Sequence, residues 1–433
     1  MNISILSVFP DLYTPFLNTS LVRRAQEKKI AHFDVSDFFS LVAPKERIDA
    51  PTFGHEAGML LRPDVVEKGI EKHEALYGKA YKIFFSPQGQ KLDQKLLKKI
   101  TQQAQEKKHL MLIPARYEGM DTRVEQVYAD EIISVGDFVL MGGDLPAMML
   151  LEGLMRLLPG VVGNTQSVEH DSFYGPFFDH PAYTEPVVWH GIEVPPIIRS
   201  GNHAAIKKAQ MEIAVANTVQ HRFDWIRSCE LTPEQKKLTA EHMPNHYVAL
   251  MHGQVLIGDG TQVGTTSVTS LDIHDIARSC KTYGIKNYFI VTPLLDQQRI
   301  VQTLLDFWQT GHGVDYNKHR HESIRQTNLV SDLDSVIAAI TQQEGVPPLV
   351  VATSAKNSGH DNLISYYDHE KVWQHKRPVL FIFGTGKGLA PEVVQQCDYL
   401  LKPVTGFTEF NHLSVRSAVA IILDRWLGIN SKP

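Results

Sequence analysis

The stretch from Ser134 to Met148 constrains the fold of this chain more than any other feature. Its apolar run Phe138 to Met141 predicts a short buried strand, which the Gly142-Gly143 pair ends. Pro146 follows where the first turn of a helix is expected. A strand, a glycine loop and a helix in this order indicate an α/β fold, and such a loop lets a nucleotide-like ligand approach the backbone and the first N–H groups of the helix. The alternative is an ordinary glycine turn, which α/β proteins use often.

The predicted helix, Ala147 to Leu158, is apolar on almost every face. Its exceptions are Glu152 and Arg156, which stand one turn apart. We therefore expect the helix to be buried, in part against another subunit. A buried Arg156 requires an anionic or carbonyl partner, and an arginine also fits the O6 and N7 edge of guanine. Pairing with Glu152 is the alternative.

Strand-like and helix-like runs alternate from Met1 to about Pro159, which predicts a largely parallel sheet. Two further turns, at residues 84–89 and 115–121, end strand-like runs. The carboxyl ends of neighbouring parallel strands meet at one crevice, where open α/β sheets bind ligands. We therefore expect these turns and residues 136–143 to lie together, although each alone fits an ordinary turn.

Length and composition set only broad limits. A chain of 433 residues exceeds one ordinary core, so two or three domains are expected, and 43% hydrophobic with 21% charged residues is typical of a globular protein. The N-terminus has no basic segment and too short an apolar run for a signal or a membrane span. Three scattered cysteines indicate neither a disulfide framework nor a zinc site, which favours the cytoplasm. The formal charge of -5 does not decide the partner.

A long irregular segment, residues 160–196, separates this region from a helical one. A helix is predicted from Gly201 to about Ile226, and Thr232 begins another with a capping-box pattern. The helical region is locally basic and resembles a phosphate-contacting surface, with a solvated helix face as the alternative. Its basic and aromatic residues are Arg199, Lys207, Lys208, Arg222, Trp225 and Arg227. Asp171, in the irregular segment, would by default cap a turn.

The second half repeats the pattern of the first after a boundary at residues 243–246. A strand over Val379 to Phe383 leads into the loop Gly384 to Gly388, and an apolar helix from Ser414 to Leu427 closes the half. The loop is no Walker motif, because neither Ser nor Thr follows its lysine. We predict two related α/β units with a helical insert between them.

Several motifs of the first half resemble the bacterial tRNA (guanine-N1)-methyltransferase family in order and spacing, over residues 1 to about 242. The motifs are Ser86-Pro87-Gln88-Gly89, Arg116-Tyr117-Glu118-Gly119, Ser134 to Met148, Leu158-Pro159-Gly160-Val161, Asp171-Ser172-Phe173 and Glu193 to His203. The resemblance implies a homodimeric SPOUT-class enzyme with a trefoil-knotted sheet. Such an enzyme uses S-adenosylmethionine to methylate N1 of guanosine at tRNA position 37. The family is also described as using magnesium, but no ligand cluster in the sequence identifies a metal site.

The resemblance also implies roles for particular residues. Asp171, from the other subunit, would remove the N1 proton, and Arg156 would hold the guanine O6. The helices from His203 to Arg227 would hold the anticodon branch. Twelve residues would surround the cofactor. They are Phe85, Ser86, Pro87, Ala115, Glu118, Val135, Gly136, Phe138, Leu140, Gly142, Gly143 and Pro146.

Three departures from the family pattern affect the expected pockets. The run Phe53 to Ala57 is bulkier and more charged than the usual glycine-rich run, Ala115 replaces a usual glycine, and Asp144 replaces a usual glutamate. These departures leave a different RNA substrate as an alternative.

The second half resembles another SPOUT-type RNA methyltransferase domain, through residues 383–390, 401–404 and 411–416. No counterpart of Asp171 is evident there, and a structural ion pair is expected for Arg416. For residues 319–321 a solvated charge cluster is favoured over an RNA contact. The resemblance implies a second cofactor loop, and a non-catalytic RNA-binding or dimerising module is the alternative. The loop residues are Gly384, Gly386, Gly388, Leu401 and Leu413.

The predicted organisation has four parts, and no part is expected to enter a membrane. Residues 1–163 form the cofactor-binding domain, 164–200 a connecting loop, 201–243 a helical tRNA-binding subdomain and 246–433 the second SPOUT-like domain.

Overall fold

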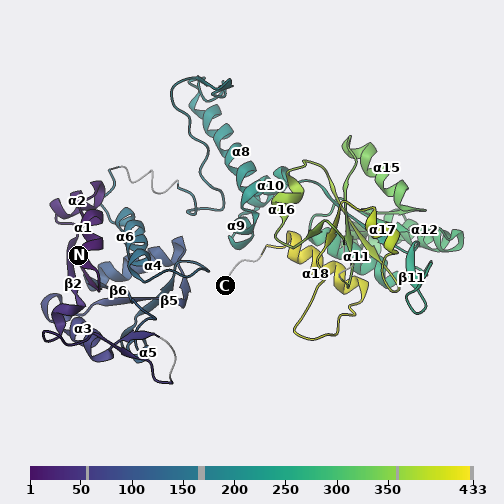
Figure 1. Cartoon of the computed structure of the whole chain (residues 1–433). Coiled ribbons are helices and arrows are strands. Elements are labelled where there is room, and N and C mark those ends of the chain that lie inside the picture. The colour runs from purple at the N-terminus through teal and green to yellow at the C-terminus, as the bar shows by residue number, and fades with distance from the viewer. Residues whose placement is uncertain (55–57, 164–170, 357–359, 430–433) are drawn as a thin grey trace. The chain divides into compact units, whose positions relative to one another are not determined.

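The computed structural model describes residues 1–54, 58–163, 171–356 and 360–429. The chain divides into two compact units, Met1–Tyr174 and Gly175–Pro433 (Figure 1). Each unit contains one large parallel sheet, as the alternating pattern predicts.

The sheet of the first unit has five parallel strands in the order β2-β1-β6-β5-β7. Strands β1 and β6 are buried along almost their whole length because helices cover both faces of the sheet, whereas the edge strand β2 carries Asp34, Ser36 and Asp37. Their bounds are β1 (Asn2–Ser7), β2 (His32–Asp37), β5 (Tyr81–Lys91), β6 (His109–Ile113) and β7 (Glu131–Ser134). A hairpin of β3 (Asp49–Pro51) and β4 (Met59–Leu61) lies outside the sheet.

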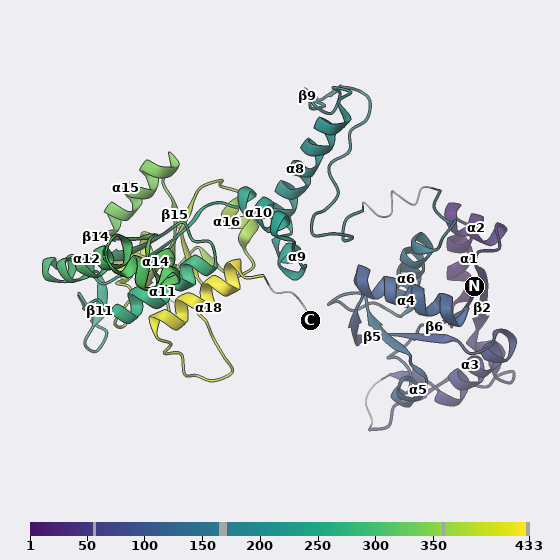
Figure 2. The same ribbon diagram turned by 180° about the vertical axis from the view of Figure 1, so that it is seen from behind.

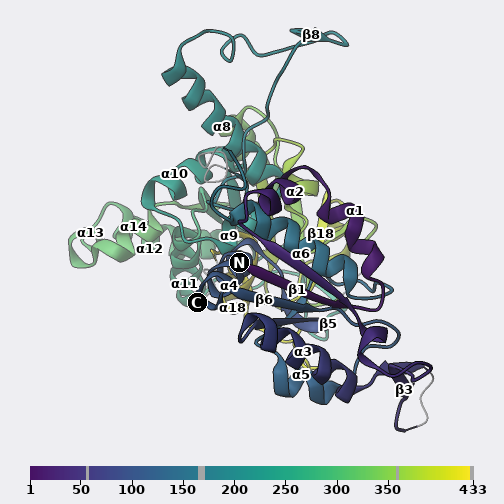
Figure 3. The ribbon, with the colours of Figure 1, turned by 90° about the vertical axis from the view of Figure 1, so that its left-hand side faces the viewer.

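Two helical layers enclose this sheet. Helices α1, α2, α4 and α6 pack with Ile3, Ile5 and Ile83 on one face, while α3 and α5 pack with Leu6 and Phe84 on the other (Figure 3). Their bounds are α1 (Tyr13–Leu17), α2 (Ser20–Glu27), α3 (Pro63–Tyr77), α4 (Gln94–Lys107), α5 (Thr122–Tyr128) and α6 (Asp144–Leu157).

The predicted strand at Phe138 to Met141 is wrong. The strand of this region is β7, and the apolar run after it is an irregular loop whose four side chains are 56%, 89%, 37% and 88% exposed. Apolarity over four residues does not distinguish a buried strand from a loop that lines a site or meets another subunit. The helix after Gly142-Gly143 is confirmed, beginning at Asp144.

The second unit has a seven-stranded parallel sheet in the order β14-β13-β10-β17-β15-β18-β16. Its five central strands are β13-β10-β17-β15-β18. In both sheets these five strands lie side by side in the same order, which is second, first, fourth, third and fifth along the chain. The predicted repetition between the halves is therefore present in the topology. The bounds are β10 (His246–Met251), β13 (Asn287–Val291), β14 (Thr327–Val330), β15 (Leu349–Thr353), β16 (Leu363–Ile364), β17 (Val379–Gly384) and β18 (Tyr399–Leu401).

Helices also cover both faces of this second sheet (Figure 2). One face carries α15 and α17, and the opposite face carries the remaining larger helices together with the helical insert. The helices of the repeated domain are α11 (Ser270–Thr282), α12 (Leu295–Gln309), α13 (Gly313–Tyr316), α14 (Lys318–Ile324), α15 (Leu333–Glu344), α16 (His369–Trp373), α17 (Pro391–Gln395) and α18 (Val415–Leu427). Two hairpins lie outside the sheet, β8 (Val188–Trp189) with β9 (Ile192–Glu193) and β11 (Val255–Ile257) with β12 (Gln262–Gly264).

The helical insert belongs to the second unit. It comprises α8 (His203–His221), α9 (Phe223–Ser228) and α10 (Pro233–His242), so the single predicted helix over 201–226 is interrupted at Arg222. The capping box that begins α10 is confirmed, because the Thr232 hydroxyl accepts the Gln235 N–H and the Gln235 side chain accepts the Thr232 N–H. Among the helices described, none is both long and apolar enough to cross a membrane.

Candidate functional site

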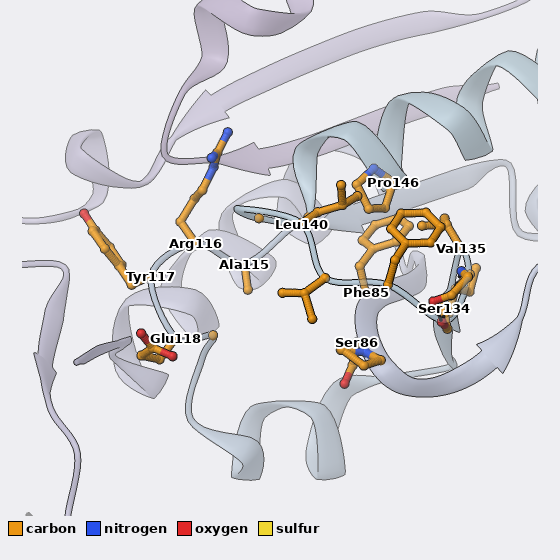
Figure 4. Close-up of a pocket in the computed structure, with 18 residues that line it drawn as sticks. Phe85, Ser86, Ala115, Arg116, Tyr117, Glu118, Ser134, Val135, Leu140 and Pro146 are labelled. Carbon is orange, nitrogen blue, oxygen red and sulfur yellow. Dashed lines mark hydrogen bonds between the residues drawn. The ribbon is translucent and has the colours of Figure 1, made fainter. Parts of the chain in front are cut away.

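Three neighbouring strands of the first unit border one cavity of about 240 Å³. Its walls are residues 85–87, which lie inside β5 where its pairing with β7 is irregular, the loop after β6, the end of β7 with the loop that follows it, and the start of α6. In Figure 4, Tyr117 and Glu118 lie on one side of this cavity, and Phe85, Ser86 and Val135 lie on the other. The three expected segments therefore lie together, but the predicted turn at residues 84–89 is wrong, because β5 continues through it to Lys91 with an irregularity between Phe85 and Gln90.

All twelve residues expected around a cofactor line this single cavity. Six further lining residues were not predicted individually, although five of them fall inside the motifs that the sequence singled out. They are Arg116, Tyr117, Gly119, Ile133, Ser134 and Val139. Ile133 is the exception, and as the buried penultimate residue of β7 it carries no polar or glycine signal.

The glycine pair before α6 allows two loops to lie in contact. A Cβ on Gly143 would stand 2.9 Å from the Cα of Pro114, and the Gly143 N–H donates to the Ala115 carbonyl over 2.8 Å. A Cβ on Gly142 would stand 2.5 Å from the Cδ of Arg116. The glycines thus serve loop packing as well as any ligand that enters the cavity.

Asp144, the first residue of α6, connects four segments beside the cavity. Its buried carboxylate accepts hydrogen bonds from the Ser7 hydroxyl (2.6 Å), the Tyr13 hydroxyl (3.0 Å) and the Arg116 Nε (2.6 Å). Burial and the adjacent negative charge raise the pKa of Tyr13, so this hydroxyl remains a donor. The network fixes Arg116, whose guanidinium also stacks on the Phe9 ring at 4.8 Å. Asp144, which replaces the glutamate usual in the family, therefore has hydrogen-bond partners on both carboxylate oxygens in this chain.

The far side of the cavity is supported by the hairpin β3-β4. The Glu118 N–H donates to the Met59 carbonyl over 3.1 Å, and a Cβ on Gly58 would stand 2.2 Å from Glu118 Cγ. Gly58 has φ +114°, a value that glycine adopts readily. The atypical run at Phe53 to Ala57 lies in the connection between β3 and β4; its residues 55–57 lie outside the described residues, and Phe53 is exposed.

Arg156 and Asp171 form an ion pair, so the expected anionic partner is present, but the expected burial of Arg156 is not observed, because its side chain is 48% exposed. Arg156 Nε donates to Asp171 Oδ2 over 3.0 Å, and Arg156 Nη2 contacts the same oxygen. The alternative pairing with Glu152 is wrong. Neither residue of the pair lines the cavity of its own chain, and both contacts leave Asp171 Oδ1 outside the pair.

Only part of the predicted basic surface lies as expected. Lys207 and Lys208 are exposed on α8, whereas the Arg227 side chain is buried and donates to three backbone carbonyls at the end of α18. Arg199 contacts Glu193, and Arg222 Nε donates to Asp224 over 3.1 Å. The free basic surface of this region is therefore smaller than the sequence suggests.

The glycine loop of the second unit is backed by its hairpin β11-β12. The Lys387 N–H donates to the Leu256 carbonyl, the Leu256 N–H donates to the Gly388 carbonyl, and both distances are 2.8 Å. Gly386 has φ +63°, and a Cβ there would stand 2.7 Å from the Leu256 oxygen. Leu401 ends β18, two strands from the loop, and the half-exposed Leu413 lies just before α18. The five predicted residues thus occupy the same topological positions as the cavity segments of the first unit.

Two secondary predictions for this unit have clear outcomes. Arg416 forms the expected structural ion pair, with its Nη1 3.0 Å from Asp272 Oδ1. Residues 319–321 are only partly a solvated cluster, because Arg320 stacks on the Trp308 ring at 4.8 Å and His321 Nδ1 lies 2.8 Å from the Trp308 carbonyl.

No metal site is assigned. Within the described parts of the chain, no group of three or more His, Cys, Asp or Glu side chains is placed to hold a metal ion.

A cavity formed by three loops at the carboxyl edge of a parallel sheet, with a glycine pair before a helix, defines an α/β protein of the nucleotide-cofactor-binding class. Comparison with known proteins narrows the class. The family model described as tRNA (guanine-1)-methyltransferase TrmD matches residues 1–228, and one described as SAM-dependent RNA methyltransferase matches residues 245–428. The chain belongs to the tRNA (guanine-1)-methyltransferase family, which confirms the resemblance seen in its motifs.

Some relatives match this chain over its whole length, and others match only its first part. A protein of Nitratidesulfovibrio vulgaris named tRNA (guanine-N(1)-)-methyltransferase is 35% identical, and the match covers 99% of each chain. One of the same name from Bacillus velezensis is 38% identical over 243 residues, which are 56% of this chain and 98% of that protein. The two-domain organisation is therefore shared with some relatives and not with others.

Proposed function

We propose that this protein transfers a methyl group from S-adenosylmethionine to N1 of the guanosine at position 37 of tRNA. The observation that carries the proposal is the convergence of all twelve expected cofactor residues on one cavity of the first unit. Family membership supports the reaction type and the tRNA substrate.

The fit to the cofactor rests on the backbone. The close approach of Gly142 and Gly143 to residues 114–116 brings main-chain groups to the cavity, which apolar side chains and the polar Ser86, Glu118 and Ser134 also line. An apolar lining with a few polar groups suits an adenosine moiety. When bound there, S-adenosylmethionine supplies an activated methyl group on a positively charged sulfur. Because that methyl group is already electrophilic, correct positioning is sufficient and the enzyme needs no covalent intermediate.

The chain's own residues prepare the guanine. N1 carries a proton and is a weak nucleophile until that proton leaves, so a general base is required. In this proposal the Asp171 carboxylate accepts the proton, and Arg156 donates to O6, where negative charge develops. Their ion pair supports the assignment because it holds base and cation together, with Oδ1 outside the pair.

The proposal includes a homodimer and a trefoil-knotted sheet. Asp171 does not line the cavity of its own chain, which is consistent with a base contributed by the partner subunit. The loop and helix beside the cavity also expose apolar side chains of a kind that subunit interfaces cover. These residues are Phe138, Val139, Met141, Leu145 and Met149.

We further propose that α8 holds the anticodon branch through Lys207 and Lys208, and that the Gly384 to Gly388 loop binds a second S-adenosylmethionine. The close packing of Gly384 and Gly386, where added side chains would meet backbone, supports the cofactor loop. Since the substrate is a cytoplasmic RNA, the protein acts in the cytoplasm. Magnesium has no assigned ligands and no role in this mechanism.

The methylated position and the requirement for guanine are tested with labelled S-adenosylmethionine and two unmodified tRNA transcripts. One transcript has guanosine at position 37 and the other has adenosine there, and they are otherwise identical. The proposal expects 1-methylguanosine in the first transcript and none in the second. Equal labelling of both would place the methyl group elsewhere and overturn the assignment. Isothermal titration of the full chain separates one cofactor site per chain from two.

A further inference from the structure

The inner face of α8 and α9 is part of the core of the second α/β domain. Val215, Val219, Phe223 and Ile226 are buried in one apolar cluster with residues of the second sheet and its helices. The Phe223 ring lies 4.7 Å from the ring of Trp373 and 4.9 Å from that of His369. We call this contact region, together with Arg227, the seam.

Arg227 fastens the seam with hydrogen bonds. Its side chain is 6% exposed, and its Nε, Nη1 and Nη2 donate to the carbonyls of Gly428 (2.6 Å), Arg425 (2.7 Å) and Asp424 (3.0 Å). Asp424 and Arg425 lie in the last turn of α18 and Gly428 directly follows it, at the end of the helix where a positive charge is favoured. The Asp424 carbonyl also accepts the Gly428 N–H over 2.8 Å. One buried side chain therefore joins α9 to the last helix of the second domain.

Contacts at the seam edge extend to α16. His221 Nδ1 lies 2.7 Å from Glu370 Oε1, and the Gln220 amide lies 3.4 Å from the Glu370 carbonyl. Because apolar packing, buried hydrogen bonds and edge contacts all fix the same two helices, α8, α9 and the second sheet form one structural body.

A one-domain relative cannot have this arrangement. The Bacillus velezensis protein is almost entirely covered by a 243-residue match, so it is too short to contain a counterpart of the second sheet. In this chain, by contrast, the domain that follows holds α9 and also α8, the helix that the proposed function assigns to tRNA.

We infer that the second α/β domain acts in tRNA binding for the reaction of the first unit, as the support that orients α8 and α9 on the anticodon branch. This inference rests on the proposed function of those helices. It predicts that loosening the seam weakens tRNA binding while the cavity of the first unit still binds S-adenosylmethionine.

The test uses full-length protein with Arg227→Met or Phe223→Ala at the seam, and Arg278→Met, an exposed arginine on α11, as the matched control. KM for tRNA, KM for S-adenosylmethionine and kcat are measured for each. If a loosened seam leaves the helices correctly placed in one molecule in ten, KM for tRNA rises about tenfold. KM for S-adenosylmethionine should remain within about twofold, and Arg278→Met should leave all three values unchanged.

Hydrogen exchange distinguishes a loosened seam from a failed fold. In the seam variants the amides of α8 and α9 should lose protection while those of β10 and β17 keep it. Arg227→Lys, which retains a charge and a donor, should restore part of the lost tRNA affinity. If α8 and α9 exchange faster but KM for tRNA does not change, the inference is overturned.

A variant in which β10 also loses protection is replaced by Glu370→Ala at the exposed edge, which should raise KM for tRNA by a smaller factor. An unchanged value would again contradict the inference. If the unaltered protein does not methylate tRNA, the proposed function itself fails.

Discussion

At the scale of single residues, the carboxylate of Asp144 has the largest structural role beside the proposed cofactor site. It is 1% exposed and accepts three hydrogen bonds, from the end of β1, from α1 and from the loop after β6. A buried carboxylate is stable only when it is paired and hydrogen-bonded, so its partners are fixed as firmly as it is.

Asp144→Asn should weaken both stability and cofactor binding. The asparagine side chain lacks the negative charge that pairs with Arg116. Its NH2 group also cannot accept a hydrogen bond, so at least one of the three donors loses its acceptor. Together these losses should lower the free energy of unfolding by about 3 kcal/mol. Urea denaturation and calorimetric titration with S-adenosylmethionine measure the two effects. The matched control is Asp137→Asn, an exposed partner of Lys91 in the next loop, which should change stability by less than about 0.5 kcal/mol. Equal effects of the two substitutions would contradict this role of Asp144.

The resemblance to a known family identified the residues of the cavity, but the sequence did not identify the partners of individual charges. The twelve cavity residues could be predicted because the motifs that carry the resemblance assign them to the cofactor. The partner of Arg156 is fifteen residues away, beyond a stretch without periodicity, and helix spacing suggested Glu152 instead. Arg227 sits among other basic residues, and only the folded chain shows that it caps α18 and does not face solvent.

At the scale of elements, the cavity depends on how closely the loops before α6 and after β6 approach each other. The sequence predicted both loops and the helix correctly, but it placed the strand at Phe138 to Met141, four residues beyond the end of β7. Strand propensity measures a preference for half-buried surface, and the same residues can cover a site from a loop.

Gly143→Ala should impair cofactor binding more than folding. Its Cβ would lie 2.9–3.0 Å from the backbone of Pro114 and Ala115, so one wall of the cavity must shift. We expect Kd for S-adenosylmethionine to rise by about tenfold, a change of about 1.4 kcal/mol. Gly163→Ala is the control, because among the described residues no heavy atom beyond its chain neighbours lies within 4 Å of the position of its Cβ. A cofactor affinity unaffected by Gly143→Ala would show that the two loops can separate without cost.

A buried histidine of β10, packed against α18, should make the stability of the second unit depend on pH. His246 Nε2 accepts a hydrogen bond from the Trp426 indole over 3.0 Å, and burial lowers the pKa of His246 to about 3. Unfolding restores an ordinary pKa of about 6.5, so the unfolded chain takes up a proton that the folded chain refuses. Stability should therefore fall as the pH decreases below about 6.5.

Urea unfolding between pH 7 and pH 5 measures this effect. His246→Gln, whose side-chain oxygen can accept from Trp426, should reduce the pH dependence by up to about 1.4 kcal/mol per pH unit, the contribution of one proton. His190→Gln, at an exposed position, should leave the slope unchanged. An unaltered slope in His246→Gln would mean that this histidine is not held neutral in the folded protein.

At the scale of the whole molecule, the chain carries the same five-strand topology twice. The order β2-β1-β6-β5-β7 recurs as β13-β10-β17-β15-β18, and the second sheet adds one strand at each edge. The repetition was predictable from the order of strand-like runs and glycine loops. The position of the helical insert was not, because its amphipathic pattern shows that a face is buried but not which domain covers it.

The seam gives the second domain a mechanical role that does not depend on whether its own glycine loop binds a cofactor. Arg227 and the aromatic rings around Phe223 connect the proposed tRNA-binding helices to that domain. Both domains would therefore serve one methyl-transfer reaction, in which the second domain supports tRNA binding.

The most direct test of the central claim compares methyl transfer by the unaltered protein and by Asp171→Ala, using labelled S-adenosylmethionine and unmodified tRNA with guanosine at position 37. The unaltered protein should form 1-methylguanosine. Asp171→Ala should lose about 10²-fold or more in kcat with cofactor affinity retained, because the variant lacks the general base but keeps the cavity. Full activity in Asp171→Ala, or no methylation of that guanosine by the unaltered protein, would contradict this claim.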